Sequence, residues 1–580
     1  MPDSSRRVFD RLLKESLRAG GSSPRGESRA VPRRKWVFVP EDQLSSAIGP
    51  LSDTKRPRGA VMIESRWKAS LRPYHIQRLA VLWSNQRQFA LELAREGVDV
   101  LYLISDEPFA IAIERALEGE LGTRMKRDAC ERLVCMRPAE RELRADLAGL
   151  IERSVIEYVP HDGWLTTPED FRKSCPKTPW KMDSFYRHVR QRTGVLMTPE
   201  GEYVGGKVSF DTENRKAWPG TPPAAKPLSF TPDEVTREVI EMVRRDFAHH
   251  PGTLDETQIP ATPKDAAALW TWAKKQCMEH FGAYEDAMSV RSRTLFHTRV
   301  STLVNMHRIL PRTIVEDVEK MNIPLASKEG FIRQVLGWRE FVRHVHDATD
   351  GFRTIAGKPV TTLDSPGSAG LERWSGKTWT TPGRASGLGG ATPAHLGGDT
   401  PLPPAFWGAP SGMRCLDEVV SSVMSEGWSH HITRLMVLSN LATLLDINPR
   451  ELTDWFWCAF TDAWDWVVEP NVLGMGTYAV GGIMTTKPYV AGSAYIDKMS
   501  DYCEHCPLTP GKTCPITRLY WAFLARHEKT LAGNPRLFMP MNALKKRSAA
   551  ERSKDHEAFV HVRDVLVAGR RLVAERLGNW

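Results

Sequence analysis

Three cysteines near the C-terminal end of the sequence have a spacing suited to binding a metal. Cys503 and Cys506 form a C-x2-C pair, and Cys514 follows after seven further residues, directly before a proline. Two thiolates three positions apart can face one centre from a tight turn. No second C-x2-C pair follows, so an iron–sulfur cluster, a zinc ion and no metal at all remain open. Candidates for a fourth ligand are Cys415, at an expected helix start, and Cys458, which lies in the apolar run WFWCAF and resembles a core thiol.

A second group of chemically competent residues lies between positions 427 and 476. His430 and His431 are adjacent, so on a helix their side chains diverge by about 100°. A plain structural interpretation places one of them in the core and the other at the surface. Asp462 and Asp465 lie three apart in a segment otherwise made of Trp, Phe, Ala and Val. Because burying an unpaired charge is costly, we expect Arg434 or a bound polar ring system to pair with these carboxylates.

Composition narrows the class of protein. The 580 residues are 41% hydrophobic and 26% charged, which excludes a wholly disordered chain and predicts several domains. Nine cysteines, an odd number, do not fit a secreted disulfide framework. The N-terminal residues lack the apolar run of a secretory signal, and no stretch reaches about 18 consecutive apolar residues. A cytoplasmic protein without a membrane span is therefore expected. The net charge of +9 permits a polyanionic partner.

The elements that must position these residues fall into two regions. Short apolar runs at 36–40, 60–65, 98–104, 132–138 and 155–160 predict strands, and residues 75–97 predict a helix ending at a glycine. This alternation indicates a parallel α/β domain over 35–165. No GxGxxG follows the first strand. Residues 231–540 show a helical pattern.

The remaining segments are predicted as connections and extensions. Residues 1–34 indicate a disordered basic extension with at most one frayed helix around 8–17. Residues 166–230 are rich in Pro, Lys and Thr and are interpreted as an interdomain linker. A Gly- and Pro-rich stretch over 355–412 predicts a mobile insertion in the helical domain. Residues 541–580 are expected to form a C-terminal helical extension.

Several long motifs together resemble the iron–sulfur bacterial branch of the photolyase/cryptochrome superfamily, and in particular the prokaryotic (6-4) photolyases. They occur in the family's order and cover residues 35 to about 540. The motifs are EDQL (41–44), LFHTRVS (295–301), EGFIRQVLGWREFVR (329–343), HHITRLM (430–436), TDAWDWVVEPNVLGMG (461–476), TKPYVAGSAYIDKMSDYC (486–503) and CPITRLYWAFLARH (514–527).

The resemblance implies a fold and a set of cofactors. The family joins a Rossmann-like α/β antenna domain to an all-helical C-terminal domain that binds FAD. It also carries a 4Fe–4S cluster, whose ligands match Cys415, Cys503, Cys506 and Cys514. The antenna pigment of relatives is 6,7-dimethyl-8-ribityllumazine, for which Asp42, Gln43 and Glu64 are the expected contacts. FAD contacts in the superfamily match Thr298, Arg299, Ser301, Gln334, Trp338, Arg339, Arg434, Asp462 and Asp465.

The resemblance also implies a light-driven reaction on DNA. In the family, reduced flavin donates an electron to a (6-4) photoproduct flipped out of the duplex, and a histidine supplies or relays a proton. His431 matches that histidine and His430 lies beside it, while Tyr489 and Tyr495 match tyrosines of the lesion pocket. Trp407 and Trp455 match an aromatic electron relay. Basic residues at the pocket mouth are expected to meet phosphates, namely Lys487, Lys498, Lys545, Lys546 and Arg547.

Some positions depart from the family's pattern. Phe456 stands after the relay tryptophan, where relatives usually have a tyrosine, so Trp457 and Trp464 are alternative relay positions. Glu469 lies one position later than the acid that relatives place near the flavin. The main hypothesis is a monomeric (6-4) DNA photolyase acting on UV-damaged DNA and associated with the bacterial nucleoid when bound to it. The alternative is a cryptochrome-like blue-light photoreceptor with a regulatory role, and a third is an iron–sulfur DNA-binding protein without photochemistry.

Overall fold

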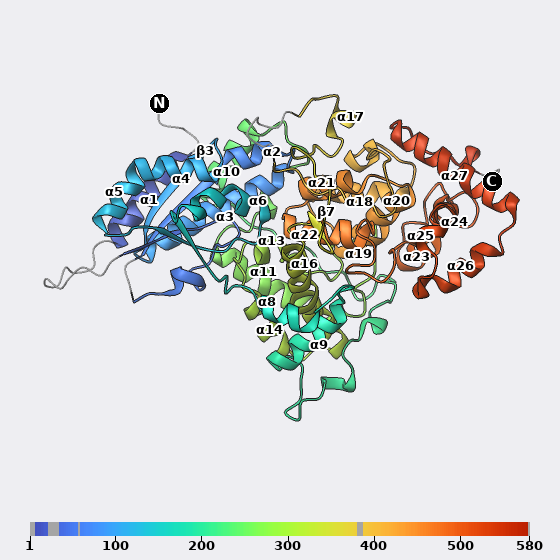
Figure 1. The fold of residues 1–580 in the computed structure, drawn as a ribbon, viewed down its shortest axis with the longest axis horizontal. Helices are drawn as coiled ribbons and strands as arrows, with labels where there is room; N and C mark the ends of the chain where they lie inside the picture. Colours follow the sequence, from blue (N-terminus) through green and yellow to red (C-terminus); the bar gives the residue numbers. More distant parts are fainter. Residues whose placement is uncertain (1–5, 21–33, 56–57, 380–386, 578–580) are drawn as a thin grey trace.

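The computed structural model describes residues 6–20, 34–55, 58–379 and 387–577. An α/β region formed by the first part of the chain occupies one end of the molecule, and the last helices occupy the other end (Figure 1). The central part of the molecule is helical. No helix within the described ranges is both long enough and apolar enough to cross a membrane.

The α/β region contains one five-stranded parallel sheet. Its strands are β1 (Lys35–Phe38), β2 (Arg58–Ser65), β3 (Asp99–Ser105), β4 (Leu133–Met136) and β5 (Ile156–Val159), in the order β3-β2-β1-β4-β5. Each of the five predicted strands is confirmed. All eight residues of β2 are buried, as expected where helices cover both faces of a parallel sheet.

Alternate residues of the strands enter two separate cores. Val37 of β1 and Met62 of β2 pack on the side of α3 (Ile76–Arg95), whereas Phe38 and Ile63 pack against α4 (Phe109–Glu118). The two-residue period of a strand produces this division. Shorter elements complete the region: η2 (Gly49–Ser52), α2 (Arg66–Leu71), α5 (Glu120–Arg127), α6 (Arg141–Asp146) and α7 (Ala148–Glu152).

The expected disordered extension contains a packed helix. In α1 (Arg7–Gly20), Phe9 is fully buried and its ring lies 4.7 Å from that of Tyr102. Glu238 accepts hydrogen bonds from the backbone N–H groups of Val8 and Phe9 at 2.8 and 3.1 Å. The expected helix around 8–17 is therefore present, but it is packed rather than frayed, because the buried Phe9 ring and the Glu238 carboxylate hold it. Residues 1–5 and 21–33 lie outside the described residues.

The predicted linker is partly helical. It contains α8 (Pro168–Ser174), α9 (Met182–Thr193), η3 (Val204–Gly206) and η4 (Asp211–Glu213). Thr167 and Asp170 form a capping box at the start of α8, which fixes where that helix begins. Helix α9 packs against the helical domain through η6 (Arg333–Arg339). The linker thus contributes two packed helices to the wall of the helical domain.

The first half of the helical domain surrounds the segment that carries LFHTRVS. Helix α10 packs against both α1 and α3 and so joins the two regions. The elements in this half are α10 (Glu234–Asp246), η5 (Glu256–Gln258), α11 (Pro263–Gln276), α12 (Met278–Phe281), α13 (Ser301–Asn305), α14 (Pro311–Lys320), α15 (Leu325–Ile332), η6 and α16 (Glu340–Ala348).

The second half holds the histidine and tryptophan motifs. Its elements are α18 (Arg414–Glu426), α19 (His431–Thr433), η9 (Arg434–Ser439), α20 (Asn440–Leu444), α21 (Pro449–Ala459), α22 (Asp465–Glu469), η10 (Pro470–Gly476) and α23 (Ser493–Met499). Three segments of the domain, η6, η9 and η10, are π-helical. Such turns occur frequently at functional sites, and η6 and η9 contain four of the predicted cofactor contacts.

The described parts of the 355–412 insertion pack against the helical domain. They include the short hairpin β6 (Thr354–Ile355) and β7 (Lys358–Pro359), α17 (Leu371–Ser375) and η8 (Pro404–Trp407). Leu402, Phe406 and Trp407 are buried. The chain ends in α24 (Ile516–Arg526), α25 (Glu528–Leu531), η11 (Pro535–Leu537), α26 (Phe538–Lys545), α27 (Ala549–Val567) and η12 (Ala574–Arg576), with α24 packed against α26 and α27.

Candidate functional site

Three histidines from two separate segments form a compact group. The rings of His297 and His430 stack with their centroids 4.3 Å apart and their planes 6° apart. One ring nitrogen from each of His297, His430 and His431 lies within 4.8 Å of the other two. His297 and His430 are buried, whereas the side chain of His431 is 41% exposed. The structure therefore brings the predicted pair together with a third histidine that the sequence did not single out.

Burial keeps these histidines neutral. It lowers the pKa of His297 and of His430 well below the usual value, and the neighbouring rings and the Arg434 guanidinium add to the effect. His431 is open to solvent on one side, but desolvation is still the largest influence lowering its pKa, opposed in part by Asp286. Nε2 of His297 and Nδ1 of His430 have no hydrogen-bond partner among the described residues. The group can therefore accept or relay a proton.

Asp286 connects the histidines to a predicted pocket tyrosine. Its Oδ1 lies 3.9 Å from Nε2 of His431, and its Oδ2 accepts a hydrogen bond from the Tyr495 hydroxyl at 3.2 Å. Burial raises the pKa of Asp286 and of both Tyr489 and Tyr495. Both tyrosines therefore remain protonated at neutral pH, and Tyr495 donates its hydroxyl to the carboxylate that faces His431.

Arg434 pairs with Asp462, as one of the two sequence-based expectations proposed. The two nitrogens Nη1 and Nη2 of Arg434 bind the two oxygens of Asp462 at 3.0 and 2.9 Å, a bidentate arrangement. Ser301 Oγ donates to Asp462 Oδ2 at 2.7 Å, and the guanidinium of Arg434 lies 4.1 Å from the centroid of the Phe460 ring. This cluster joins the first residue of α13, the first residue of η9 and the loop after α21.

Hydrogen bonds extend this cluster to other predicted cofactor residues. Asn305 donates to the backbone oxygen of Asp462 at 2.9 Å and accepts from Nε of Arg339 at 3.3 Å. The Arg339 guanidinium lies 4.1 Å from the Trp164 ring, and burial lowers its pKa to about 10. Ser301, Arg339, Arg434 and Asp462 thus share one continuous polar network.

Gln334 and Trp338 lie on the same π-helical segment as Arg339. Gln334 Nε2 donates to Glu285 Oε1 at 2.6 Å, and burial raises the pKa of Glu285 to about 7. Because Glu285 precedes Asp286, this contact links Gln334 to the histidine group. Trp338 is half-buried and meets Phe341 edge to face.

Thr298 and Arg299 follow His297 directly. Thr298 is buried, and Arg299 pairs with Glu426 at 2.7 Å while its guanidinium lies 4.6 Å from the Trp428 ring. Arg299 has a φ of 55°, a left-handed conformation that is costly for a residue with a Cβ. Such strain is concentrated at binding and catalytic sites.

Four cysteines converge on a second location. Cys415, near the start of α18, and Cys503, Cys506 and Cys514, from the segment before α24, line one cavity. Met413, Ile496, Leu508 and Ile516 supply its apolar walls. Burial raises the pKa of Cys415 well above its usual value, and the other three thiols add to this rise. Cys458 lies fully buried elsewhere in α21.

The cysteine sulfur atoms are spread apart. Among the described residues, the histidine group is the only set of three or more His, Cys, Asp or Glu whose ligand atoms all lie within 4.8 Å of one another. The four sulfur atoms therefore lie around the cavity and are not gathered closely enough to meet at one ligand position.

Comparison with known proteins identifies the family. The (6-4) photolyase of Agrobacterium fabrum (strain C58) is 31% identical over 525 residues, which cover 87% of this chain and 94% of that protein. This chain belongs to the photolyase family. A family described as deoxyribodipyrimidine photo-lyase-related protein matches residues 37–259. The crystal structure of a bacterial class III photolyase from Agrobacterium tumefaciens shares the fold, with a TM-score of 0.52 at 13% identity over 93% of this chain and 100% of that one.

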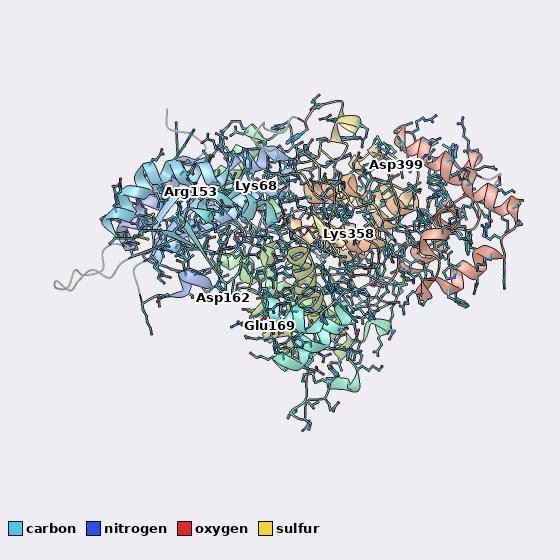
Figure 2. All side chains as sticks on the ribbon, viewed as in Figure 1. Lys68, Arg153, Asp162, Glu169, Lys358 and Asp399 are labelled. Carbon is cyan, nitrogen blue, oxygen red and sulfur yellow. The ribbon has the colours of Figure 1, made fainter. Side chains whose placement is uncertain are left out.

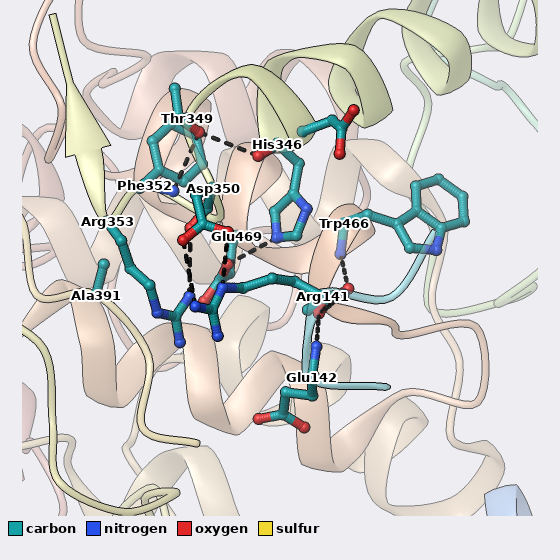
Figure 3. A network of polar contacts seen from close by, with 12 residues as sticks. Arg141, Glu142, His346, Thr349, Asp350, Phe352, Arg353, Ala391, Trp466 and Glu469 are labelled. Carbon is teal, nitrogen blue, oxygen red and sulfur yellow. Dashed lines mark hydrogen bonds and ion pairs between the residues drawn. The ribbon is translucent and has the colours of Figure 1, made fainter. Parts of the chain in front are cut away.

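Asp465 of this photolyase-family chain faces the α/β region rather than the Arg434–Asp462 cluster. Its Oδ2 accepts hydrogen bonds from the backbone N–H groups of Arg141 and Glu142 at 2.6 and 3.1 Å. Figure 3 shows the same junction, where Arg141 also pairs with Asp350 at 2.9 Å. The structure therefore places Asp465 in an interdomain contact, apart from the other predicted cofactor residues.

Glu469 lies in the same buried network. Its carboxylate meets His346 Nε2 at 2.9 Å (Figure 3). It also accepts a hydrogen bond from Arg450 at 2.7 Å. Burial alone would raise its pKa, but the contacts with His346 and Arg450 outweigh burial and lower the pKa to about 2. Glu469 is thus a buried carboxylate with a partner on each oxygen, and it is deprotonated at neutral pH.

The three residues expected to hold an antenna pigment differ in whether their polar atoms already have hydrogen-bond partners. Glu64 is buried between Arg87, at 2.8 and 3.0 Å, and the Tyr102 hydroxyl, at 2.8 Å. Gln43 donates to the Met136 backbone oxygen at 2.8 Å. Asp42 Oδ1 has no partner among the described residues, and burial together with Glu41 raises the pKa of Asp42 to about 7.

A buried cluster of charged side chains lies next to Asp42, one of the residues expected to hold the antenna pigment. Lys68 pairs with Glu41 and, at 2.6 Å, with Glu140. Lys68 lies on the part of the α/β region nearer the helical domain, whereas Arg153 lies farther out (Figure 2). Burial disfavours the Lys68 ammonium, but the two carboxylates outweigh burial and raise its pKa. Lys68 is therefore a permanent cation at the domain junction.

An aromatic path runs from the Arg434 cluster to the surface. The Trp455 ring lies 5.8 Å from Phe460, which contacts Arg434, and 5.4 Å from Phe406. Trp407, the next residue, is buried and stacks on Trp374 with centroids 6.3 Å apart. Trp374 is 41% exposed. Both predicted relay tryptophans thus lie on one path, whose outer member comes from the insertion.

Sequence analysis missed several residues of the site. His297 lies inside the LFHTRVS motif, immediately before two predicted contacts, and this position was the available signal. Asp286 and Glu285 are adjacent acids with no motif around them, and Trp374 lies in a Gly- and Pro-rich segment. Only the folded chain places these three beside their partners.

Proposed function

We propose that this protein is a flavin-dependent DNA photolyase that reverses (6-4) pyrimidine–pyrimidone photoproducts in UV-damaged DNA. The observation that carries the proposal is the group of His297, His430 and His431 with Asp286 and Tyr495 beside it. Neutral imidazoles, a carboxylate and a hydroxyl at an accessible edge match the proton transfer that this repair needs. The named activity of the Agrobacterium relative supports the same assignment.

The polar network that includes Ser301, Arg339, Arg434 and Asp462 fits the binding of FAD. Hydroxyl and guanidinium groups suit phosphates, and a carboxylate held by Arg434 suits the N–H edge of a flavin. Thr298, Arg299, Gln334 and Trp338 complete the proposed contacts. When bound, the flavin supplies light-driven one-electron chemistry. The protein's own part is to orient the lesion, exclude water and hold the proton near His431.

The four cysteines fit a 4Fe–4S cluster better than a zinc ion. Four thiolates on one zinc at about 2.3 Å would bring their sulfurs to roughly 3.8 Å from one another. Sulfur atoms spread around an apolar cavity suit a larger group of several atoms. We therefore assign Cys415, Cys503, Cys506 and Cys514 as cluster ligands.

Two further roles follow from the same proposal. Trp455 and Trp407 would carry an electron from an external thiol reductant toward the site at which the Arg434 network would hold the flavin. Phe456 takes no part by deprotonation, because a phenyl ring has no acidic proton. A ribityllumazine antenna is assigned to Asp42 and Gln43, since Asp42 has a free buried oxygen whereas Arg87 and Tyr102 satisfy Glu64.

Repair of synthetic oligonucleotides tests the function. The purified protein is illuminated with duplexes that carry either a (6-4) photoproduct or a cyclobutane dimer, and the products are separated. We expect loss of the (6-4) lesion in the light and not in the dark. Flavin photoreduction without repair of either lesion would contradict the proposal and favour a cryptochrome-like photoreceptor.

A further inference from the structure

Two large apolar side chains project into solvent at the start of α26. Phe538 is 65% exposed and Met539 is 77% exposed, more than any other large hydrophobic residue that the structure describes. Single exposed apolar residues are common, but a neighbouring pair at the first turn of a helix indicates contact with another molecule.

The surroundings of this pair are strongly basic. Residues 533–547 contain four basic residues and no acidic one. Arg536, Lys545 and Lys546 are exposed. Of the four basic residues, only Arg547 makes an ion pair within the described part of the chain, with Asp555 at 2.8 Å. A polyanion therefore complements this surface, whereas a second copy of the same cationic patch would be repelled.

Hydrogen bonds attach this surface to the loop that carries Tyr489. Asn534 Nδ2 donates to the Thr486 backbone oxygen at 3.0 Å, and Asn534 Oδ1 accepts from the Arg536 backbone N–H at 3.0 Å. The start of η11 is thus fixed next to Lys487, and three residues further on the chain reaches Phe538. The apolar pair is therefore close to the proposed lesion pocket.

Lys487 and Arg536 are two neighbouring cations where η11 meets the loop that carries Tyr489. Burial lowers the pKa of Lys487, and the charges of Arg536 and Arg215 lower it further. Neither Lys487 nor Arg536 makes an ion pair with any residue in the described ranges. A bound phosphate would relieve this repulsion.

We propose that Phe538 and Met539 form an apolar wedge that inserts into the DNA stack beside the flipped lesion, while Lys487 and Arg536 hold the flanking phosphates. The inference rests on the proposed function, because it supposes DNA at the Tyr489 pocket. Apolar side chains that enter a base step fill the space left by an extruded base and stabilise the bent duplex.

The double variant Phe538→Ala/Met539→Ala tests the wedge. Both side chains are exposed, so the substitutions should leave folding and flavin content unchanged. We expect affinity for a (6-4) duplex to fall about tenfold, with little change for undamaged duplex, in fluorescence anisotropy titrations. A 2-aminopurine placed opposite the lesion should brighten on binding the wild type and much less on binding the variant.

Two comparison variants sharpen the result. Val573→Ala removes another exposed apolar side chain on a different element and should bind both duplexes like the wild type. Lys487→Gln/Arg536→Gln should weaken binding to damaged and undamaged DNA alike, and should reduce the slope of log affinity against log salt by about 2.

The outcomes separate the inference from the proposed function. A wild type that repairs the (6-4) lesion, with a wedge variant that binds and unstacks it equally well, would overturn the wedge alone. A wild type that neither binds nor repairs the lesion would overturn both. Loss of a dimer in the wedge variant, measured by light scattering, would show that the pair is a contact between copies and also overturn the inference.

Discussion

At the scale of single residues, the proposed proton transfer depends on how burial and one carboxylate change the pKa of His431. Desolvation lowers the pKa of His431, whereas Asp286 at 3.9 Å raises it. Asp286 is itself shared with Tyr495, so the carboxylate joins two groups that face the proposed lesion. Removal of His431 and removal of Asp286 should therefore have different consequences.

We expect His431→Ala to abolish light-dependent repair and to leave the flavin bound, because the proposed flavin contacts are spread over many other residues. Asp286→Asn should retain repair but shift the acidic limb of its pH profile to lower pH, since the imidazolium loses its stabilising carboxylate. Repair rates under saturating light from acidic to neutral pH measure both effects. An unshifted profile in Asp286→Asn would show that His431 does not control the limb.

Glu469 provides a stability prediction that is independent of activity. Its pKa is about 2 in the folded protein against 4.5 in an unfolded chain, so the carboxylate stabilises the fold at neutral pH by about 3 kcal/mol. That contribution is complete above the unfolded pKa and is lost as the pH falls from there through the folded pKa. Urea unfolding should therefore show Glu469→Gln to be less stable than the wild type at pH 7, with the difference shrinking in acid. A difference that does not vary with pH would contradict the ion-pair origin.

At the scale of elements, the cysteine cavity ties together segments about ninety positions apart in the chain. Helix α18 supplies Cys415, and the segment before α24 supplies the other three ligands. A cluster bound there crosslinks the flank of the histidine site to the C-terminal helices. Its loss removes a long-range constraint in addition to a chromophore.

Cys503→Ser should lower the soluble yield, remove iron and lower the melting temperature. Cys130→Ser is the matched control, because Cys130 is a half-buried thiol of the α/β region that donates to the Arg132 backbone oxygen. Metal analysis and visible absorption measure the cluster directly. A soluble, iron-free Cys503→Ser protein with an unchanged melting temperature would show that the cluster is dispensable for the fold, and zinc in place of iron would show that the metal assignment is wrong.

The insertion contributes the outer member of the aromatic path. Because Trp374 stacks on Trp407 and is exposed, Trp374→Phe should slow photoreduction by an external thiol several-fold without changing repair by the already reduced protein. Trp379→Phe, in the same insertion but stacked on His249, is the control. Absorption changes during blue illumination give the rate, and equal rates in both variants would remove Trp374 from the path.

At the scale of the whole molecule, the N-terminal helix and the interdomain contacts combine the two regions into one unit. Helix α1 packs on α3 and α10, and Asp465 and Asp350 hold Arg141 across the junction. Residues 7–20, which were expected to form at most a frayed helix, therefore contribute Phe9 and Leu13 to the buried core.

Phe9→Ala should therefore destabilise the protein by about 3 kcal/mol or more, because it empties a fully buried aromatic site beside Tyr102. Arg11→Ala, on the exposed side of the same helix, should cost far less. Thermal unfolding of the two variants measures the difference. Equal melting temperatures would show that the helix is peripheral after all.

The strands of the sheet and the types of chemistry could be predicted from the sequence, whereas the helices of the 166–230 segment could not. Short apolar runs located all five strands, and the joint motifs indicated the family and the predicted cofactor residues Ser301, Arg339, Arg434 and Asp462. These features depend on local periodicity or on short segments, so they can be read without knowledge of the fold. The cysteine spacing likewise indicated three ligands of a common centre.

Only the tertiary structure decided which residues meet. Asp462 and Asp465 lie three positions apart, yet one faces Arg434 and the other faces α6, because the chain turns between them before α22 begins. His297 joins His430 across more than one hundred positions, and Trp374 reaches Trp407 through a segment without helical or strand periodicity. Such pairings depend on how helices pack, and the free energy of packing is a property of surfaces that come together only in the folded chain.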